Sequence, residues 1–514
     1  MLSNRGRRFL MGLAVVGLVT VLFPIAASAD PETFDFVETD VATADFVESA
    51  VDVVYPITFP VVGDTYYSDT FGACRDGCSR RHTGIDIMTY GWKGLPIVAA
   101  HSGTITLTTE SAGRDCCAIW GLTSDDGWKS LYIHMNNDTP GTDDGQGWGF
   151  APGIDVGTAV EEGQLIGWVG DSGNAERVSP HLHFELHKDG VRINPYPSLR
   201  AATKIDMPRI AGDDRFHTAV AISLSAYPGG ADIVYVATGY NFPDALAGGP
   251  GAVKADGPIL LSRVDSIPAV TLDEIRRLSP SRIVILGGEA ALAPPVADAL
   301  ASTGADVVRL AGRDRYDTAA MISAMHFDSG VSIAFVTGGT DFPAAVAGAP
   351  AAAASDAPML LTRPDDLPSY TRDELKRLQP EVIMILGGSD VVGTSVEQEL
   401  AAYALSGVVQ RLSGDDQYAT AVAISQWAQP EDSATAYVAT SGTFVDALAG
   451  VSVAVRDGAP ILLVGDDLAV VTADELERLG AINIVALGGP AAVVPRVAMR
   501  IWSILNNNDM PLWK

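Results

Sequence analysis

The chain has 514 residues, enough for several domains, and 47% of them are hydrophobic, as in a globular protein. Its 63 acidic residues outnumber its 34 basic residues and give a formal net charge of −29. Such a surface repels nucleic acid, whose phosphates proteins neutralise with Lys and Arg, so we expect no nucleic-acid partner.

The N-terminus has the pattern of a secretory signal peptide. Three arginines lie within the first eight residues, an apolar run extends from Phe9 to about Ala26, and Ala-Ser-Ala ends at position 29. An apolar run of this length would also serve as a membrane anchor. We favour cleavage before Asp30, which makes 1–29 the signal peptide and leaves an exported chain that is free of the membrane.

An acidic segment separates the signal peptide from the first folded domain. Residues 30–54 contain several acids and no basic residue, which is typical of a solvated linker or pro-segment. From position 55 to about 200, short alternating runs broken by glycine, such as "KSLYIHM" and "GQLIGWVGDSG", predict an all-β, antiparallel domain.

All four cysteines lie in this domain, at Cys74, Cys78, Cys116 and Cys117. An even number in an exported chain favours two disulfides. A zinc site is the alternative, but "CRDGC" and "CC" lack the paired C-x-x-C spacing of a structural site. Because neighbouring cysteines would be strained if they paired with each other, we expect Cys116 and Cys117 each to bond to Cys74 or Cys78.

Four histidines and one aspartate of the β domain form a candidate metal site. "RRHTGIDIM" contains His82 and Asp86, "LYIHM" contains His134, and "PHLHFELH" contains His181 and His183. Residues two apart on a strand point to the same face, so His181 and His183 project together. Histidine nitrogens and an aspartate oxygen are ligands of zinc, and a catalytic site uses three of them. The spacing alone does not separate the role of His181 from that of His183.

The ordered set H-x-x-x-D, Y-x-H and P-H-L-H-F-E resembles the lysostaphin-type zinc metallopeptidases, which cut peptide bridges or stems of bacterial peptidoglycan. The resemblance covers about Phe59 to Pro195. It implies one zinc ion per chain and two sets of residues: the metal ligands His82, Asp86 and His183, and the catalytic pair His134 and His181. The pair would orient the nucleophilic water and stabilise the oxyanion. The four cysteines and the insert "TPGTDDGQGWGF" depart from the family pattern.

After residue 200 the chain becomes rich in alanine and repeats itself three times. Related segments begin at Arg209, Arg309 and Arg411, 100 and 102 residues apart, and periods this long are typical of tandem domains. We therefore divide the chain into a β domain of 55–200 and repeats of 207–306, 307–408 and 409–507.

The sequence pattern of each repeat predicts three helices and three strands in alternation. In the first copy the strands are "DIVYVATG", "GPILLS" and "RIVILGG", and their lack of polar alternation predicts burial on both faces. Strands that alternate with helices predict a parallel sheet covered by helices. The third helix of each copy has the spacing of a capping box, in Thr271 and Glu274, Thr371 and Glu374, and Thr472 and Glu475.

The repeated motif R-x-x-G-x-D-R-Y-x-T-A, followed by F-x-D-A-L and a strand that ends in L-G-G, is similar to the clostridial-type cell-wall-binding repeats, which usually occur in threes. The resemblance implies three α/β Rossmann-like modules that pack together and hold the protein noncovalently on anionic wall polymers. Because this chain is acidic, it would bind such a polymer by local geometry or through cations. The glycine pairs lack a G-x-G-x-x-G fingerprint and are interpreted as tight turns.

Two motif positions differ among the copies, an arginine in the first helix and an aspartate in the Ala-rich helix: Arg215, Arg315 and Gln417, and Asp244, Ala344 and Asp446. These residues form either unequal polymer contacts or ion pairs within the protein. The isolated histidines His101, His187, His217 and His326 are interpreted as structural.

Together these patterns predict an exported zinc endopeptidase that hydrolyses peptide bonds of peptidoglycan and is anchored on a Gram-positive cell wall by its C-terminal modules. The expected partners are the peptidoglycan peptide as substrate and an anionic wall polymer as anchor. The alternative is a non-catalytic wall-binding scaffold, or a regulator of another wall hydrolase, whose β domain only docks.

Overall fold

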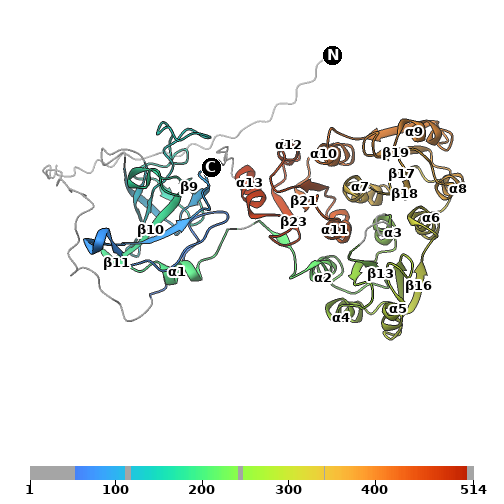
Figure 1. The fold of residues 1–514 in the computed structure, drawn as a ribbon, viewed down its shortest axis with the longest axis horizontal. Coiled ribbons are helices and arrows are strands. Elements are labelled where there is room, and N and C mark those ends of the chain that lie inside the picture. Colours follow the sequence, from blue (N-terminus) through green and yellow to red (C-terminus); the bar gives the residue numbers. More distant parts are fainter. Residues whose placement is uncertain (1–52, 110–116, 206, 241–246, 341, 506–514) are drawn as a thin grey trace, which may run out of the picture.

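The computed structural model describes residues 53–109, 117–205, 207–240, 247–340 and 342–505. The predicted signal peptide and nearly all of the acidic segment lie outside the described residues. A β-rich part and a part with three α/β units lie side by side (Figure 1). Among the described helices, none is both long and apolar enough to cross a bilayer.

The β-rich part is built on an antiparallel seven-stranded sheet, in the order β11-β10-β7-β6-β5-β8 with β3 also paired to β10. Its strands are β3 (Ile85–Met88), β5 (Gly103–Thr108), β6 (Ile119–Thr123), β7 (Trp128–Ile133), β8 (Ala159–Val160), β10 (His181–Lys188) and β11 (Val191–Ile193). Two small pairs are β1 (Cys74–Arg75) with β2 (Arg80–Arg81), and β4 (Pro96–Val98) with β9 (Leu165–Trp168). One short helix, α1 (Tyr196–Ala201), follows.

The alternation of apolar and polar residues determines which face of the sheet packs against the hydrophobic core. In β3, Ile85 and Ile87 are fully buried in the domain's hydrophobic core, whereas Asp86 and Met88 point to the more open face. On β10, Leu182 belongs to the same core. The other face is therefore left for polar side chains.

The expected cysteine pairing is wrong. Cys74 is bonded to Cys78, with their Cα atoms 4.5 Å apart. The chain between them turns sharply at Asp76 and Gly77, both with positive φ, and this turn brings the two cysteines together. Cys117 is also disulfide-bonded, and Cys116 lies outside the described residues.

Each repeat supplies three strands to a parallel sheet of four strands that is covered by helices. The strands are β13 (Ile233–Thr238), β14 (Ile259–Ser262), β15 (Arg282–Leu286) and β16 (Asp306–Leu310); β17 (Ile333–Gly338), β18 (Met359–Thr362), β19 (Val382–Leu386) and β20 (Val408–Leu412); and β12 (Arg209–Ile210), β21 (Thr435–Thr440), β22 (Ile461–Val464) and β23 (Asn483–Leu487).

Four helices accompany each sheet. They are α2 (Arg215–Ala226), α3 (Gly248–Lys254), α4 (Ala269–Leu278) and α5 (Pro294–Ala301); α6 (Arg315–His326), α7 (Pro343–Ala354), α8 (Ser369–Leu378) and α9 (Thr394–Leu400); and α10 (Gln417–Ala428), α11 (Val445–Arg456), α12 (Val470–Arg478) and α13 (Pro495–Leu505). The sequence predicted three helices and three strands per copy, so one of each was missed.

The fourth strand of every sheet comes from another repeat. The strand that opens the second repeat, β16, completes the first sheet, and β20 of the third repeat completes the second. The three sheets form a closed ring, because β12, at the start of the first repeat, pairs with β23 of the third. The three repeats are therefore joined head to tail through their sheets.

The arginine that opens each repeat fastens this shared strand. Arg309 donates to the carbonyls of Gly287 and Leu292 in the preceding repeat, and Arg411 binds the matching carbonyls of the second repeat. Arg209 donates to the carbonyl of Val493 in the third repeat. The glycine pairs form tight turns, with φ near +100° at the first glycine of each pair, and the first two pairs accept from Arg309 and Arg411.

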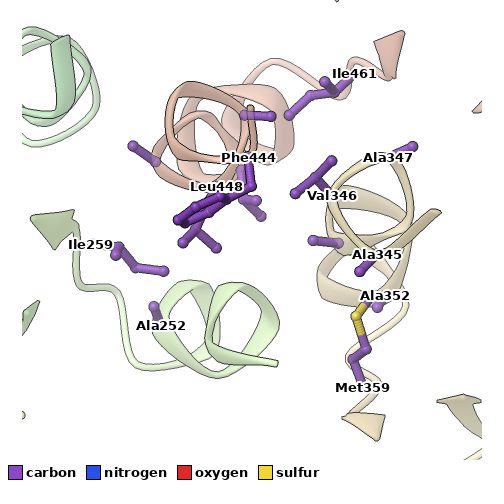
Figure 2. Close-up of a cluster of buried hydrophobic side chains, with 14 of the residues drawn as sticks. Ala252, Ile259, Ala345, Val346, Ala347, Ala352, Met359, Phe444, Leu448 and Ile461 are labelled. Atoms are coloured by element: carbon purple, nitrogen blue, oxygen red, sulfur yellow. The ribbon is translucent and has the colours of Figure 1, made fainter. Parts of the chain in front are cut away.

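The Ala-rich helices α3, α7 and α11 meet at the centre of the ring (Figure 2). A Cβ atom at Gly348 would lie 2.2 Å from Leu386 Cδ1, and one at Gly450 would lie 2.3 Å from Leu487 Cδ1. Small residues are therefore needed where these helices press against their own sheets. The segments "FPAAVAG" and "FVDALAG" are therefore packing motifs at these positions.

The capping-box interpretation is wrong. Helix α4 begins at Ala269, so Thr271 lies inside the helix and its hydroxyl donates to the carbonyl of Leu261 on β14. Glu274 instead accepts from Ser223 of α2 and from Arg277. The pair joins the helix to its sheet and to a neighbouring helix. The hydroxyl groups of Thr371 and Thr472 make the same contact with a strand carbonyl.

Helix α13 contacts both parts of the molecule (Figure 1). Val497 and Ile501 are buried in the core of the third repeat, whereas Met499 is buried in the core of the β domain. Trp502 also packs against the β domain. The last helix of the ring thus joins the repeats to the β domain.

Candidate metal centre

Pairing of β3 with β10 positions the candidate residues on one face of the sheet. His183 lies opposite Asp86, and His181 lies opposite Met88. His82 precedes β3 and reaches the same face across Gly84, where a Cβ atom would lie 2.4 Å from the carbonyl oxygen of Phe184. The close approach of the 82–84 segment to β10 therefore requires glycine.

Three donor atoms converge on this face. His82 Nε2 lies 3.0 Å from Asp86 Oδ1 and 3.1 Å from His183 Nδ1, and His183 Nδ1 lies 2.9 Å from Asp86 Oδ1. These atoms are close enough to one another to share one cation. Two imidazole nitrogens and one carboxylate oxygen are a donor set that fits zinc and leaves a further coordination position open.

Each of the three residues also makes a hydrogen bond on the side that faces away from the other donor atoms. His82 Nδ1 lies 3.1 Å from the carbonyl oxygen of Thr70, which fixes its proton on Nδ1. Arg75, on the disulfide-linked turn, donates to Asp86 Oδ2 at 2.9 Å. His183 Nε2 lies 3.2 Å from Glu185 Oε1. When the rings are neutral, these contacts leave a lone pair on each nitrogen that faces the other donors.

The ionised carboxylate of Asp86 makes the donor group favourable for a positive charge, carried either by a proton on His183 or by a metal ion. Burial opposes ionisation of Asp86, but its hydrogen bonds to His183 and His82 hold the pKa of that carboxyl well below its usual range. Burial would lower the pKa of His183, yet hydrogen bonds to Asp86 and Glu185 raise this pKa to about 9. A metal ion must displace that proton, so binding should weaken in acid.

His134 and His181 form a second pair beside the donor group, with their ring centroids 4.9 Å apart. The Nδ1 atom of each lies 2.8 Å from a backbone carbonyl oxygen, that of Ser172 for His134 and that of Ser179 for His181. Each Nδ1 therefore carries the proton, and each Nε2 is free to act on a ligand. Burial lowers the pKa of His134 to about 4, so this imidazole is neutral at pH 7.

The structure separates the two histidines that sequence spacing could not. His183 Nδ1 lies 2.9 Å from Asp86 Oδ1, whereas His181 Nε2 lies 3.9 Å from the same oxygen. All five predicted residues are brought together. Sequence reasoning missed Glu185 and Arg75, although Glu185 is part of the quoted P-H-L-H-F-E motif.

A second group of carboxylates in the β domain already contains a cation. Asp138, Asp143 and Asp171 surround the ammonium group of Lys93 at 2.6, 2.6 and 2.7 Å. Although burial opposes the charge of Lys93, hydrogen bonds to these carboxylates hold its pKa above the usual range. Asp171 precedes Ser172, so this ion pair supports the loop whose carbonyl orients His134.

Of the variable motif positions of the repeats, the two arginines have partners within the protein. Arg215 and Arg315 donate to the carbonyls of Gly239 and Gly339. Asp446 is buried, and its Oδ1 has no hydrogen-bond partner among the described residues. Burial raises the pKa of Asp446 to about 6, and the charge of Arg215 opposes this shift. Asp244 lies outside the described residues.

Comparison with known families assigns both parts of the chain. The family model for peptidase family M23 matches residues 80–195, and that for cell wall binding domain 2 (CWB2) matches residues 209–297, 309–397 and 411–498. The chain belongs to the CWB2 family, with an M23 peptidase domain before its three repeats. The donor group described above lies within the M23 domain.

Several known proteins are similar to parts of this chain. The L-Ala–D-Glu endopeptidase of Bacillus subtilis (strain 168) is 34% identical over 154 residues, 28% of this chain and 42% of that protein. The amidase enhancer of the same organism is 32% identical over 308 residues, 59% of this chain and 39% of that protein. The chain thus spans less than half the length of these two relatives. Cwp8 from Clostridium difficile shares the fold, with a TM-score of 0.56 at 23% identity over 79% of this chain and 64% of that chain.

Proposed function

We propose that this protein is an exported zinc-dependent endopeptidase that hydrolyses peptide bonds in peptidoglycan. The observation that carries the proposal is the convergence of His82 Nε2, Asp86 Oδ1 and His183 Nδ1 beside the pair His134 and His181. The M23 family match and the endopeptidase relative support the same activity.

The chemistry divides between the ligands and the histidine pair. Bound zinc would polarise the scissile carbonyl and lower the pKa of a water molecule. His134, neutral at pH 7 because burial lowers its pKa to about 4, presents Nε2 as an acceptor for a proton of the attacking water. His181, when protonated on Nε2, would donate to the oxygen that becomes negative.

The three CWB2 repeats would hold the enzyme on the cell wall through an anionic polymer. Support comes from the CWB2 matches and from the fold shared with Cwp8. Because the net charge of the chain is −29, we propose binding through local geometry or bridging cations. Wall binding should then survive moderate salt. We propose 55–200 as the catalytic domain and 207–306, 307–408 and 409–507 as the repeats.

A second candidate function is regulation of another wall hydrolase. It is favoured by the relative whose name is amidase enhancer, which is 32% identical over 308 residues. A regulator has no need for the three converging donor atoms or for two further histidines with oriented protons. For this reason we prefer the enzyme.

Substitution of single histidines tests the proposal. His183→Ala in the full mature chain should abolish both zinc binding and the release of muropeptides from purified walls. His181→Ala should keep one zinc ion per chain and reduce hydrolysis by about 10²-fold or more. His217→Ala, which changes an exposed histidine beside Asp214, is the matched control. Hydrolysis that survives both His183→Ala and chelation would exclude the zinc enzyme.

A further inference from the structure

We propose that Glu185 is a positioning residue that holds His183 in the one tautomer that can bind the metal. This inference rests on the proposed function, because it assigns a role within the same site. Glu185 lies in the P-H-L-H-F-E motif, and no role for it follows from the sequence pattern.

Glu185 occupies a buried place directly behind the metal ligand. It lies two residues after His183 on β10, so both side chains project from the same face. The residue is 4% exposed. Its Oε1 lies 3.2 Å from His183 Nε2, on the side of the ring opposite the converging donor atoms.

The second oxygen of Glu185 is held independently. Glu185 Oε2 lies 2.7 Å from His187 Nε2, and the Nε atom of Arg192 approaches the same oxygen at 3.6 Å. A buried carboxylate is costly unless it is paired, so these contacts keep Glu185 charged. The carboxylate is thereby fixed in position and orientation before it meets His183.

The consequence for His183 follows from the chemistry of imidazole. A neutral ring carries one proton, and a carboxylate at Nε2 retains the proton there. Nδ1 then has a free lone pair, and it is this atom that lies 2.9 Å from Asp86 Oδ1. If the proton moved to Nδ1, the ring could no longer serve as a ligand. The negative charge of Glu185 also increases the donor strength of the ring.

A purely structural role for Glu185 would be independent of the tautomer of His183. The neighbouring residues Phe184 and Leu186 are fully buried and already supply the apolar packing of β10. Glu185 contributes a charge on the opposite face, where the described partners of its two oxygens are His183, His187 and Arg192.

Zinc affinity and tautomer state provide the test, measured on the full mature chain. Glu185→Ala should weaken zinc binding by about 10- to 100-fold in competition with a chromophoric chelator. Glu185→Gln should bind more tightly than Glu185→Ala, because its side-chain oxygen still accepts from Nε2–H. Glu162→Ala, which removes a carboxylate that accepts from Thr58 far from the donor group, is the matched control.

A second measurement does not depend on hydrolysis or on zinc. With ¹⁵N-labelled histidine in the metal-free protein at a pH above about 9, where the His183 ring is neutral, its nitrogen shifts should report a proton on Nε2, and Glu185→Ala should change that pattern. Wild-type zinc affinity in Glu185→Ala, with unchanged shifts, would overturn the proposal. If Glu185→Ala does not fold, Glu185→Met, which removes the acceptor but keeps the length of the side chain, decides, since unchanged affinity and unchanged shifts in that variant would also overturn the proposal. If the wild-type chain bound no zinc, the proposed function would fail, whereas the shifts would still report on Glu185.

Discussion

Arg496 of helix α13 lies over the indole ring of Trp92, with its guanidinium carbon 4.5 Å from the ring centroid. Arg496 belongs to the third repeat and Trp92 to the β domain. Together with the buried Met499, this contact joins the two parts at a point distant in sequence from the 202–208 connection. The peptidase domain and the wall-binding ring are therefore held in a defined orientation.

Trp92→Ala should release this orientation. The substitution removes a cation–π contact worth about 0.5–2 kcal/mol and part of the apolar surface that covers α13. We expect a larger radius of gyration by small-angle X-ray scattering and faster proteolysis within 202–208. Trp148→Ala, at a tryptophan that contacts Phe150 instead, is the control. Identical scattering from the Trp92→Ala variant and the wild type would show that the contact does not hold the parts together.

Gly84→Ala should damage the donor group although it adds only one methyl group. The new Cβ atom would lie 2.4 Å from the carbonyl oxygen of Phe184 and 2.8 Å from His183 Nε2, so the 82–84 segment must move away from β10. We expect a loss of about 1–3 kcal/mol in the free energy of unfolding and weaker zinc binding. Thermal unfolding and chelator competition measure the two effects. Gly229→Ala, where no atom lies within 4 Å, should change neither.

Asp446→Asn should stabilise the protein at neutral pH. Burial raises the pKa of Asp446 to about 6 from its ordinary value of 3.8, so the folded chain retains a proton that the unfolded chain releases. Stability is therefore lost as pH rises from about 4 to about 6. The variant should be more stable than the wild type at pH 7.5, by at most about 3 kcal/mol, and similar to it near pH 4.

Asp457→Asn is the comparison variant, for which we expect a change in stability of the opposite sign. Hydrogen bonds from Arg456 and Tyr437 hold the pKa of Asp457 below its usual range, so its ionised form is favoured in the folded state. This substitution should destabilise the protein at pH 7.5. Melting temperatures of both variants at pH 4 and pH 7.5 distinguish the cases, and an equal shift at both pH values would contradict the role of Asp446 burial.

Removal of the Cys74–Cys78 disulfide should loosen the turn that carries Arg75. A loop of this size contributes about 2 kcal/mol at most through the entropy of the unfolded chain. In the double variant Cys74→Ser and Cys78→Ser, hydrogen exchange should accelerate across 74–81 and remain slow in β10. Loss of protection in β10 would mean that the disulfide supports the whole sheet.

Features that depend on local pattern could be predicted from the sequence. Alternation along β10 placed His181 and His183 on one face, and the structure has them there. Buried apolar strands alternating with helices predicted parallel sheets, which are observed. The three repeats, visible as related segments at Arg209, Arg309 and Arg411, are confirmed by the CWB2 matches.

Features that depend on contacts between distant segments could not be predicted from the sequence. Strand β12 has two residues and no recognisable pattern, so its pairing with β23 is decided by the packing of whole repeats. The cysteine pairing depends on the turn at Gly77 rather than on cysteine spacing. Thr271 matched a capping box by spacing, but a strand carbonyl lies within reach of its hydroxyl. Glu185 gave no separate signal because a buried acid on a strand resembles an exposed one in sequence.

The closed ring of sheets determines how the number of repeats could change by gene duplication. Because β12 of the first repeat completes the third sheet, loss of the last repeat would leave β12 without its partner strand and Arg209 without the carbonyl of Val493. A fourth copy added at the end would separate β12 from β23 and would have to rebuild both contacts. The three repeats therefore form one closed unit, and a change in their number would leave strand pairs to be rebuilt.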